Sequence, residues 1–117
     1  MIHQMKLRKN PFEKIRAGHK TIELRLYDEK RQRIRVGDQI EFTNLADLSQ
    51  KLVTQVVALH RFDSFAELFR ALPASAMGYT PDQIPDPGDM EAYYSKDEQA
   101  LYGVVGIELT LYAPPIK

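Results

Sequence analysis

The chain has 117 residues, of which 44% are hydrophobic and 27% are charged, and this length and composition predict one folded domain over residues 1–117. It contains no cysteine, which excludes disulfides, thiolate metal sites and a thiol nucleophile. No apolar run approaches the roughly 18 residues that a membrane span needs, and basic residues interrupt the N-terminus before a signal-peptide core could form. We therefore expect a cytoplasmic protein with no membrane contact, and its oligomeric state is left open.

The charges are unevenly distributed along the chain. The formal net charge is zero, with 16 basic and 16 acidic residues. Residues 1–35 hold 11 Lys or Arg and four Asp or Glu, a balance of +7, so the remaining 82 residues carry −7. If residues 1–35 form one surface, that surface suits phosphates. The alternative is a group of solvated side chains without a binding role, and charge alone favours neither interpretation.

The first part of the chain is expected to contain two strands separated by a helix. An imperfect alternation of apolar and polar residues predicts a strand over residues 1–7. Asn10 as a cap and Pro11 in the first helical position then predict a helix of about two turns, which Gly18 ends. Over residues 20–26 apolar and polar side chains alternate strictly, as in a half-buried strand with its polar face in solvent.

Further elements follow in the rest of the chain. Three more strands are expected, at residues 39–42, 51–62 and 102–112. The segment at residues 44–50 is expected to be a hairpin loop. A capping box formed by Ser64 and Glu67 precedes a helix with apolar residues at the i, i+3, i+4, i+7 positions. After a Pro- and Gly-rich loop, Asp89 caps a short helix over residues 90–94.

The order of these elements indicates a fold class. The strands lack the regular intervening helices of a parallel βαβ sheet. We therefore expect an α+β fold, in which a small, mostly antiparallel β-barrel carries short helices at its ends. The phenylalanines on predicted buried faces are assigned to its core, namely Phe12, Phe42, Phe65 and Phe69.

Several kinds of catalytic and cofactor site are excluded by their missing motifs. The three histidines, His3, His19 and His60, lie far apart and show no metal-ligand spacing. The sequence also lacks a Gly-x-Ser-x-Gly elbow and any glycine loop of the phosphate- or dinucleotide-binding type. Neither a metal nor a cofactor is expected.

One strand start carries an unusual density of functional groups, since Lys20, Thr21, Glu23 and Arg25 follow directly after a helix. Lys and Arg can hold a phosphate or a carbonyl oxygen, Glu can accept from an exocyclic amine of a base, and Thr can donate or accept. The alternative is an ion pair of Glu23 with Arg25 on a solvated strand face, contributing under about 1 kcal/mol. Spacing alone favours this alternative.

The aromatic residues offer a second possible contribution to binding. Six tyrosines could supply stacking surfaces for bases, and Tyr79, in the Pro- and Gly-rich loop, is the best placed. Most of the other tyrosines are expected to pack in or beside the core.

Two motifs resemble the ASCH domain family: AGHKTIELR at residues 17–25, after a short helix, and VGDQIEF at residues 36–42. ASCH domains are similar to the PUA fold, a small β-barrel with flanking helices, which agrees with the expected elements over nearly the whole chain. The resemblance implies binding of RNA or nucleotides in a cleft beside the helix-to-strand junction. The candidate nucleic-acid-binding residues are Lys20, Thr21, Glu23, Arg25, Arg16 and Tyr79, with Lys20 and Arg25 as the main anchors and Glu23 reading a base edge.

The same resemblance implies an alternative, enzymatic function. Some small bacterial members of the family are amidohydrolases that deacetylate N4-acetylcytidine with a Lys, a Thr three residues later and a more distant Glu. Lys20 matches that Lys, but Glu23 stands in the position of the Thr, so the proposed nucleophile is absent. In this hypothesis Lys20 is the catalytic base and Glu23 positions water or substrate. A third possibility is an interaction domain that uses the acidic part of the chain.

Overall fold

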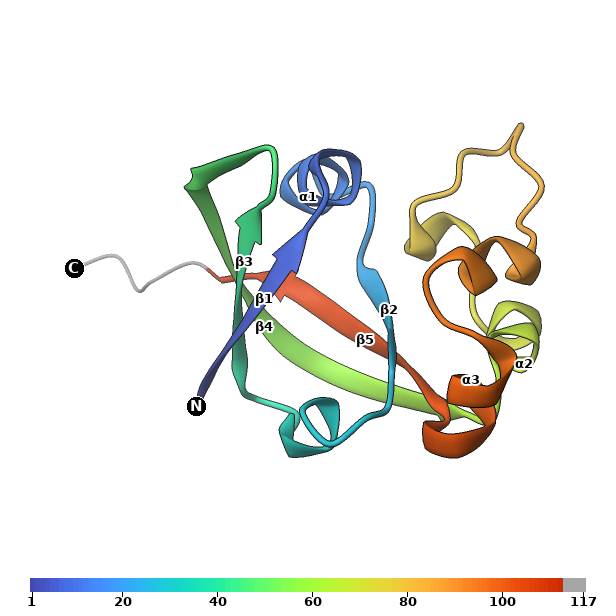
Figure 1. Ribbon diagram of the computed structural model, residues 1–117. Helices are drawn as coiled ribbons and strands as arrows, with labels where there is room; N and C mark the ends of the chain where they lie inside the picture. Colours follow the sequence, from blue (N-terminus) through green and yellow to red (C-terminus); the bar gives the residue numbers. More distant parts are fainter. Residues whose placement is uncertain (113–117) are drawn as a thin grey trace.

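The fold is that of a computed structural model, which describes residues 1–112, so the last five residues of the expected domain lie outside the described part. The strands are β1 (Ile2–Leu7), β2 (Ile22–Leu26), β3 (Gln39–Asn44), β4 (Asp47–Phe62) and β5 (Val104–Leu111) (Figure 1). The α-helices are α1 (Lys9–Arg16), α2 (Phe65–Ala71) and α3 (Lys96–Tyr102), and the 3-10 segments are η1 (Arg31–Arg33), η2 (Ser75–Met77) and η3 (Pro87–Ala92).

The five strands form one curled sheet in the order β1-β3-β4-β5-β2, so the expected α+β class is confirmed. Three of the four strand pairings are antiparallel, whereas β1 pairs with β3 in parallel, from Ile2 opposite Gln39 to Leu7 opposite Asn44. The expectation of a mostly antiparallel sheet is therefore only partly correct. The parallel pair is possible because α1, β2 and η1 supply the long crossover connection that parallel strands need.

Side chains bridge the two edges of this sheet. β1 and β2 are the edge strands, and the curl of the sheet brings them close enough for side chains of one edge to reach the other. Arg25 on β2 donates from Nη2 to the carbonyl oxygen of Lys6 on β1 at 2.8 Å. Lys30, after β2, donates from Nζ to the carbonyl oxygen of Gln4 at 2.7 Å. The sheet is thus a half-barrel whose open side is crossed by cationic side chains.

The core consists of two clusters on either side of the sheet. The first joins α1 to the concave side of the sheet and includes Phe12 and Phe42. The second packs α2 and η2 against β2 and β5 and includes Phe65. The expected core positions of these three phenylalanines are confirmed, and Phe69 is half-buried beside the second cluster. Burying each large apolar side chain stabilises the fold by roughly 1.5–3 kcal/mol, and Figure 1 shows how α1 and α2 cover different parts of the sheet.

The hairpin between β3 and β4 is longer than the sequence indicates. The loop expected at residues 44–50 is wrong, because β4 begins at Asp47 and Asn44 pairs with Asp47 across a two-residue turn. The turn is supported by the side chain of Asn44, whose Oδ1 accepts from the backbone N–H of Ala46 at 2.9 Å. Asn and Asp favour turns, and several of them near one turn make the loop look longer than it is.

Two helix starts also differ from expectation. The bounds and cap expected for the helix at residues 90–94 are wrong: the structure has the 3-10 helix η3 (Pro87–Ala92), capped by Asp86 and not by Asp89, and α3 follows it. Ser95 caps α3 in a capping box with Glu98, in which each side chain accepts from the other residue's backbone N–H. This Ser-x-x-Glu pattern is a signal that sequence reasoning overlooked. α1 begins earlier than expected, with Arg8 and not Asn10 at its N-cap, and that cap makes no side-chain hydrogen bond.

Candidate functional site

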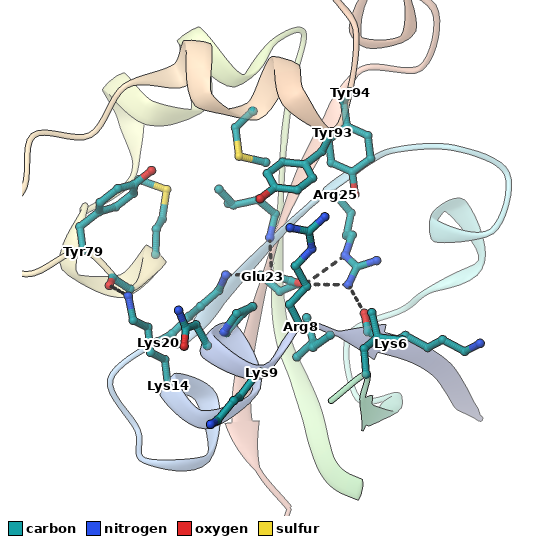
Figure 2. A pocket seen from close by; sticks show the side chains of 18 of the residues that line it. Lys6, Arg8, Lys9, Lys14, Lys20, Glu23, Arg25, Tyr79, Tyr93 and Tyr94 are labelled. Carbon is teal, nitrogen blue, oxygen red and sulfur yellow. Dashed lines mark hydrogen bonds and ion pairs between the residues drawn. The ribbon is translucent and has the colours of Figure 1, made fainter. Parts of the chain in front are cut away.

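A pocket of about 700 Å³ lies between α1, β2 and the segment from η2 to α3. Six cationic residues line it, namely Lys6, Arg8, Lys9, Lys14, Lys20 and Arg25. Three tyrosines complete one side, namely Tyr79, Tyr93 and Tyr94 (Figure 2). Within the described residues, Glu23 is the one acidic residue of this lining. The pocket therefore combines an excess of positive charge with aromatic surface.

Glu23 and the two cations beside it form a buried ionic group, which we call the Glu23 triad. Lys20 Nζ lies 2.9 Å from Glu23 Oε1, and Arg25 donates to Glu23 Oε2 from Nε at 3.0 Å and from Nη2 at 2.8 Å. The Glu23 side chain is 6% exposed, and those of Lys20 and Arg25 are 12% and 14% exposed. The interpretation of this pair as a solvated surface contact is therefore wrong.

The triad keeps the carboxyl group of Glu23 ionised. Burial alone would raise its pKa, but the positive charges of Lys20 and Arg25 and their hydrogen bonds outweigh burial and lower the pKa to about 2. Burial acts to lower the pKa of Arg25, and the opposing charge of Glu23 raises it above its usual value. Each charge thus depends on the others for its stability in a site with little water.

The hydrogen bonds that Glu23 already makes determine whether its carboxylate can accept a further hydrogen bond from a ligand. A carboxylate has two oxygens with about four lone-pair sites. Oε1 accepts from the backbone N–H of Leu24 at 3.2 Å and faces Lys20, and Oε2 accepts twice from Arg25. Both oxygens are therefore already engaged, and Glu23 could accept from the amine of a base only if one of these partners left. Its role is better described as an internal counterion that orients two cations.

Other pocket cations are held by different contacts. Lys14 donates from Nζ to the carbonyl oxygen of Gly78 at 2.8 Å, which joins α1 to η2. The guanidinium of Arg8 lies over the ring of Tyr93, 4.9 Å from its centroid. One wall of the pocket is formed by α1, and the opposite wall by the segment between η2 and α3. These two contacts join the two walls directly.

The tyrosines are fixed to different extents. Tyr94 stacks on Phe65 with 5.7 Å between ring centroids, and Tyr79 packs edge-on against Phe69 at 6.1 Å. Burial is the main cause that raises the pKa of both hydroxyl groups, so both tyrosines remain neutral. Tyr93 is 54% exposed and is the most accessible of the three for stacking with a ligand.

The structure brings together four of the six residues predicted to bind nucleic acid: Lys20, Glu23, Arg25 and Tyr79 all line the pocket. The other two, Thr21 and Arg16, are exposed outside the lining. Thr21 instead joins the fold through its backbone N–H, which donates to the carbonyl oxygen of Ala76 at 2.8 Å. The Arg16 guanidinium lies 5.7 Å from the ring centroid of Phe12.

The predicted site residues do not include six that carry the charge or aromatic surface of the pocket: Lys6, Arg8, Lys9, Lys14, Tyr93 and Tyr94. The cations belong to the basic first 35 residues, so the charge distribution indicated the region but not the positions. Tyr93 and Tyr94 are among the six tyrosines that could stack on a base, but no local signal distinguishes them, because only the tertiary packing of the segment after η3 brings them into the pocket wall.

Gly78 allows the close approach between η2 and the lysines of the pocket. Its φ is +98°, and a Cβ there would lie 3.3 Å from Lys20 Cδ and 3.4 Å from Lys14 Cδ. We expect Gly78→Ala to lower the free energy of unfolding in urea by roughly 1–2 kcal/mol. Gly18→Ala is the matched control, because its φ is +81° with open space around the added Cβ. Equal losses in both variants would show that contact with the lysines contributes nothing.

Among residues 1–112, no group of three or more His, Asp or Glu side chains lies in a position to hold a metal ion. In the same residues, every helix is too short or too polar to cross a membrane.

Comparisons with known proteins place the chain in a family. No protein with a curated functional description matches the chain. The crystal structure of hypothetical protein PH0355 is similar, with 30% identity and a TM-score of 0.81 over 96% of this chain and 100% of that one. The solution NMR structure of protein PF0455 from Pyrococcus furiosus is also similar, with 28% identity and a TM-score of 0.66. The match covers 95% of this chain and 97% of that one. The family model of the ASCH domain matches residues 5–113, and the chain therefore belongs to the ASCH domain family.

Proposed function

We propose that the pocket binds RNA or a nucleotide, with phosphate on its cations and a base against its tyrosines. The observation that carries the proposal is the excess of six cationic residues over one acidic residue in a pocket of about 700 Å³. A volume of this size suits a small ligand such as a nucleotide. Membership of the ASCH family and the half-barrel, which agrees with a PUA-like fold, support the same conclusion.

The positive charge of the pocket is available to a ligand because Glu23 neutralises only part of it. Within the Glu23 triad one carboxylate faces two cations. Lys20 has three donors, of which the contact with Glu23 uses one, so its ammonium group can also donate to a phosphate or a base carbonyl. Lys6 and Lys9, also in the lining, add charge. Lys20 and Arg25 are thus the proposed anchors, and Glu23 orients them and does not read a base. Roles for Thr21 and Arg16 in binding stay predictions.

The first experiment is a salt titration of binding to a short single-stranded RNA, with free nucleosides, including N4-acetylcytidine, as competitors. Binding led by phosphates falls steeply with salt and is insensitive to nucleosides. Displacement by one nucleoside, independent of salt, would instead indicate a neutral small-molecule pocket. No binding of any RNA or nucleotide would contradict the proposed function.

Lys9→Gln is the cleaner substitution for testing the pocket, because Lys20 and Arg25 are needed to neutralise Glu23. Lys9 is exposed in the first turn of α1. We expect Lys9→Gln to weaken RNA binding by roughly fivefold and to make the salt dependence shallower by about 0.7 in log–log slope. The midpoint of urea unfolding should not change. Lys96→Gln is the control, since Lys96 is exposed and outside the pocket lining, and equal effects of both variants would reject a role for Lys9 in the pocket.

The amidohydrolase alternative gains no support from the site geometry. Its proposed nucleophile is absent, and both carboxylate oxygens of Glu23 are already engaged by Leu24, Lys20 and Arg25, so Glu23 has no free acceptor with which to position water or substrate. The alternative is tested by release of acetate from N4-acetylcytidine at high enzyme concentration. Turnover that disappears in Lys20→Ala, with folding checked by circular dichroism, would favour it over simple binding.

A further inference from the structure

A line of cationic side chains extends from the pocket along the open side of the half-barrel. It consists of Lys6, Arg25 and Lys30, which we call the seam cations. Lys6 and Arg25 line the pocket, and Lys30 lies beyond its lining, on the connection after β2. The bonds of Arg25 to Lys6 and of Lys30 to Gln4 hold both cations against the edge of β1. The positive surface therefore continues beyond the pocket lining.

Arg25 and Lys30 are anchored at neighbouring points on β1. Gln4 and Lys6 are two residues apart on β1, so their carbonyl oxygens lie about 6.5 Å apart along the same edge. The two cations anchored on these oxygens are therefore held at successive positions along the strand. An extended single strand of nucleic acid repeats its phosphates at a similar spacing. Anchoring also reduces the side-chain entropy that binding would otherwise remove.

Lys30 lies in a region of crowded positive charge. Its pKa is lowered mainly by burial, and the positive charges of Arg31 and Arg25 lower it further. Asp28 acts in the opposite direction, and it is engaged by Arg31 at 3.0 Å. An added anion would relieve the repulsion at this position, as expected for a surface that attracts phosphate.

We propose that the pocket ligand is a single-stranded RNA longer than one nucleotide, whose chain leaves the pocket across Lys6 and Arg25 and places its next phosphate on Lys30. This inference rests on the proposed function. It adds the path that the RNA takes out of the pocket and the class of ligand, a polymer and not a free nucleotide. A mononucleotide in the pocket does not reach Lys30, because Lys30 lies outside the lining. Lys30 therefore distinguishes a polymer from a free nucleotide.

The test compares Lys30→Gln with the wild type for two ligands, uridine 5′-monophosphate and an eight-nucleotide uridine RNA, over a range of salt concentrations. We expect the affinity for the octamer to fall roughly fivefold, with a log–log salt slope shallower by about 0.7. The affinity for the monophosphate should be unchanged. Lys96→Gln, which removes an exposed lysine on α3, should leave both affinities unchanged.

The possible results separate the inference from the proposed function. If Lys30→Gln leaves the octamer unaffected, or weakens both ligands equally, the path along the seam is wrong while the pocket remains a binding site. Binding of the monophosphate without tighter binding of the octamer to the wild type would also overturn the inference. If the wild type binds neither ligand, the proposed function itself fails.

Discussion

Glu23→Gln is expected to lower the free energy of unfolding by about 3 kcal/mol, the largest effect of any single substitution considered for the pocket. Glutamine keeps the size of the side chain but removes its negative charge, so Lys20 and Arg25 remain buried without a counterion. Breaking a buried ionic group by removing one partner is strongly destabilising, because the remaining charges have lost both water and their partner. Urea unfolding followed by circular dichroism measures the change.

Glu91→Gln provides the matched control for this substitution. Glu91 pairs with Lys96 at 3.7 Å, and their side chains are 45% and 83% exposed. An exposed pair of this kind contributes under about 1 kcal/mol, so the control should unfold close to the wild type. If Glu23→Gln also unfolds within about 1 kcal/mol of the wild type, water or an anion must already reach Lys20 and Arg25, and our account of the triad as a buried group would be wrong.

Lowering the pH should reduce the free energy of unfolding of the wild type by about as much as the Glu23→Gln substitution does at neutral pH. The pKa of Glu23 is about 2 in the folded protein, against 4.5 for an unperturbed glutamate. Between these values the unfolded chain binds the proton more readily, so stability rises with pH in this range. The contribution of Glu23 is complete above about pH 4.5 and is lost as the pH falls towards 2, and it amounts to about 3 kcal/mol.

The measurement is the free energy of unfolding as a function of pH for the wild type and for Glu23→Gln. Other carboxyl groups also have lowered pKa values: that of Asp38 is lowered chiefly by its hydrogen bond with His3, and that of Asp47 by its bonds with Ser49. Both proteins share these groups, so the difference between the two curves isolates Glu23. The curves should converge as the pH falls from about 4.5 to 2, and parallel curves would contradict the lowered pKa.

Local sequence patterns predicted those parts of the fold that depend on near neighbours. Half of the capping box expected for α2 is present: Ser64 Oγ accepts from the backbone N–H of Glu67 at 3.2 Å, whereas Glu67 Oε2 accepts from the backbone N–H of Asp63 at 3.3 Å and not from that of Ser64. The strict alternation at residues 20–26 corresponds to β2. The parallel pairing of β1 with β3 could not be predicted in the same way, because neither strand's own sequence encodes the direction of its partner.

The burial of the candidate site could not be predicted for a related reason. Alternation along β2 placed Glu23 and Arg25 on one face, and a single strand gives no information about what covers that face. The segment from η2 to α3 covers it, yet this segment contains several prolines and glycines and reads as a loop. The chemistry of the site was therefore visible in the sequence, whereas its low exposure, and with it the lowered pKa of Glu23, depends on packing between distant segments.

The order of strands in the sheet has a consequence for synthesis on the ribosome. β2 pairs with β5, and Ile22 lies opposite Glu108, 86 positions later in the chain. A nascent chain therefore exposes its basic N-terminal third before β5 has emerged, and β2, an edge strand whose partner is β5, stays unpaired until then. Contacts of such long sequence separation form late and slowly. The pocket consequently takes its folded shape only after β5 has been synthesised, and until then its cations face the negatively charged RNA of the ribosome without the surrounding walls.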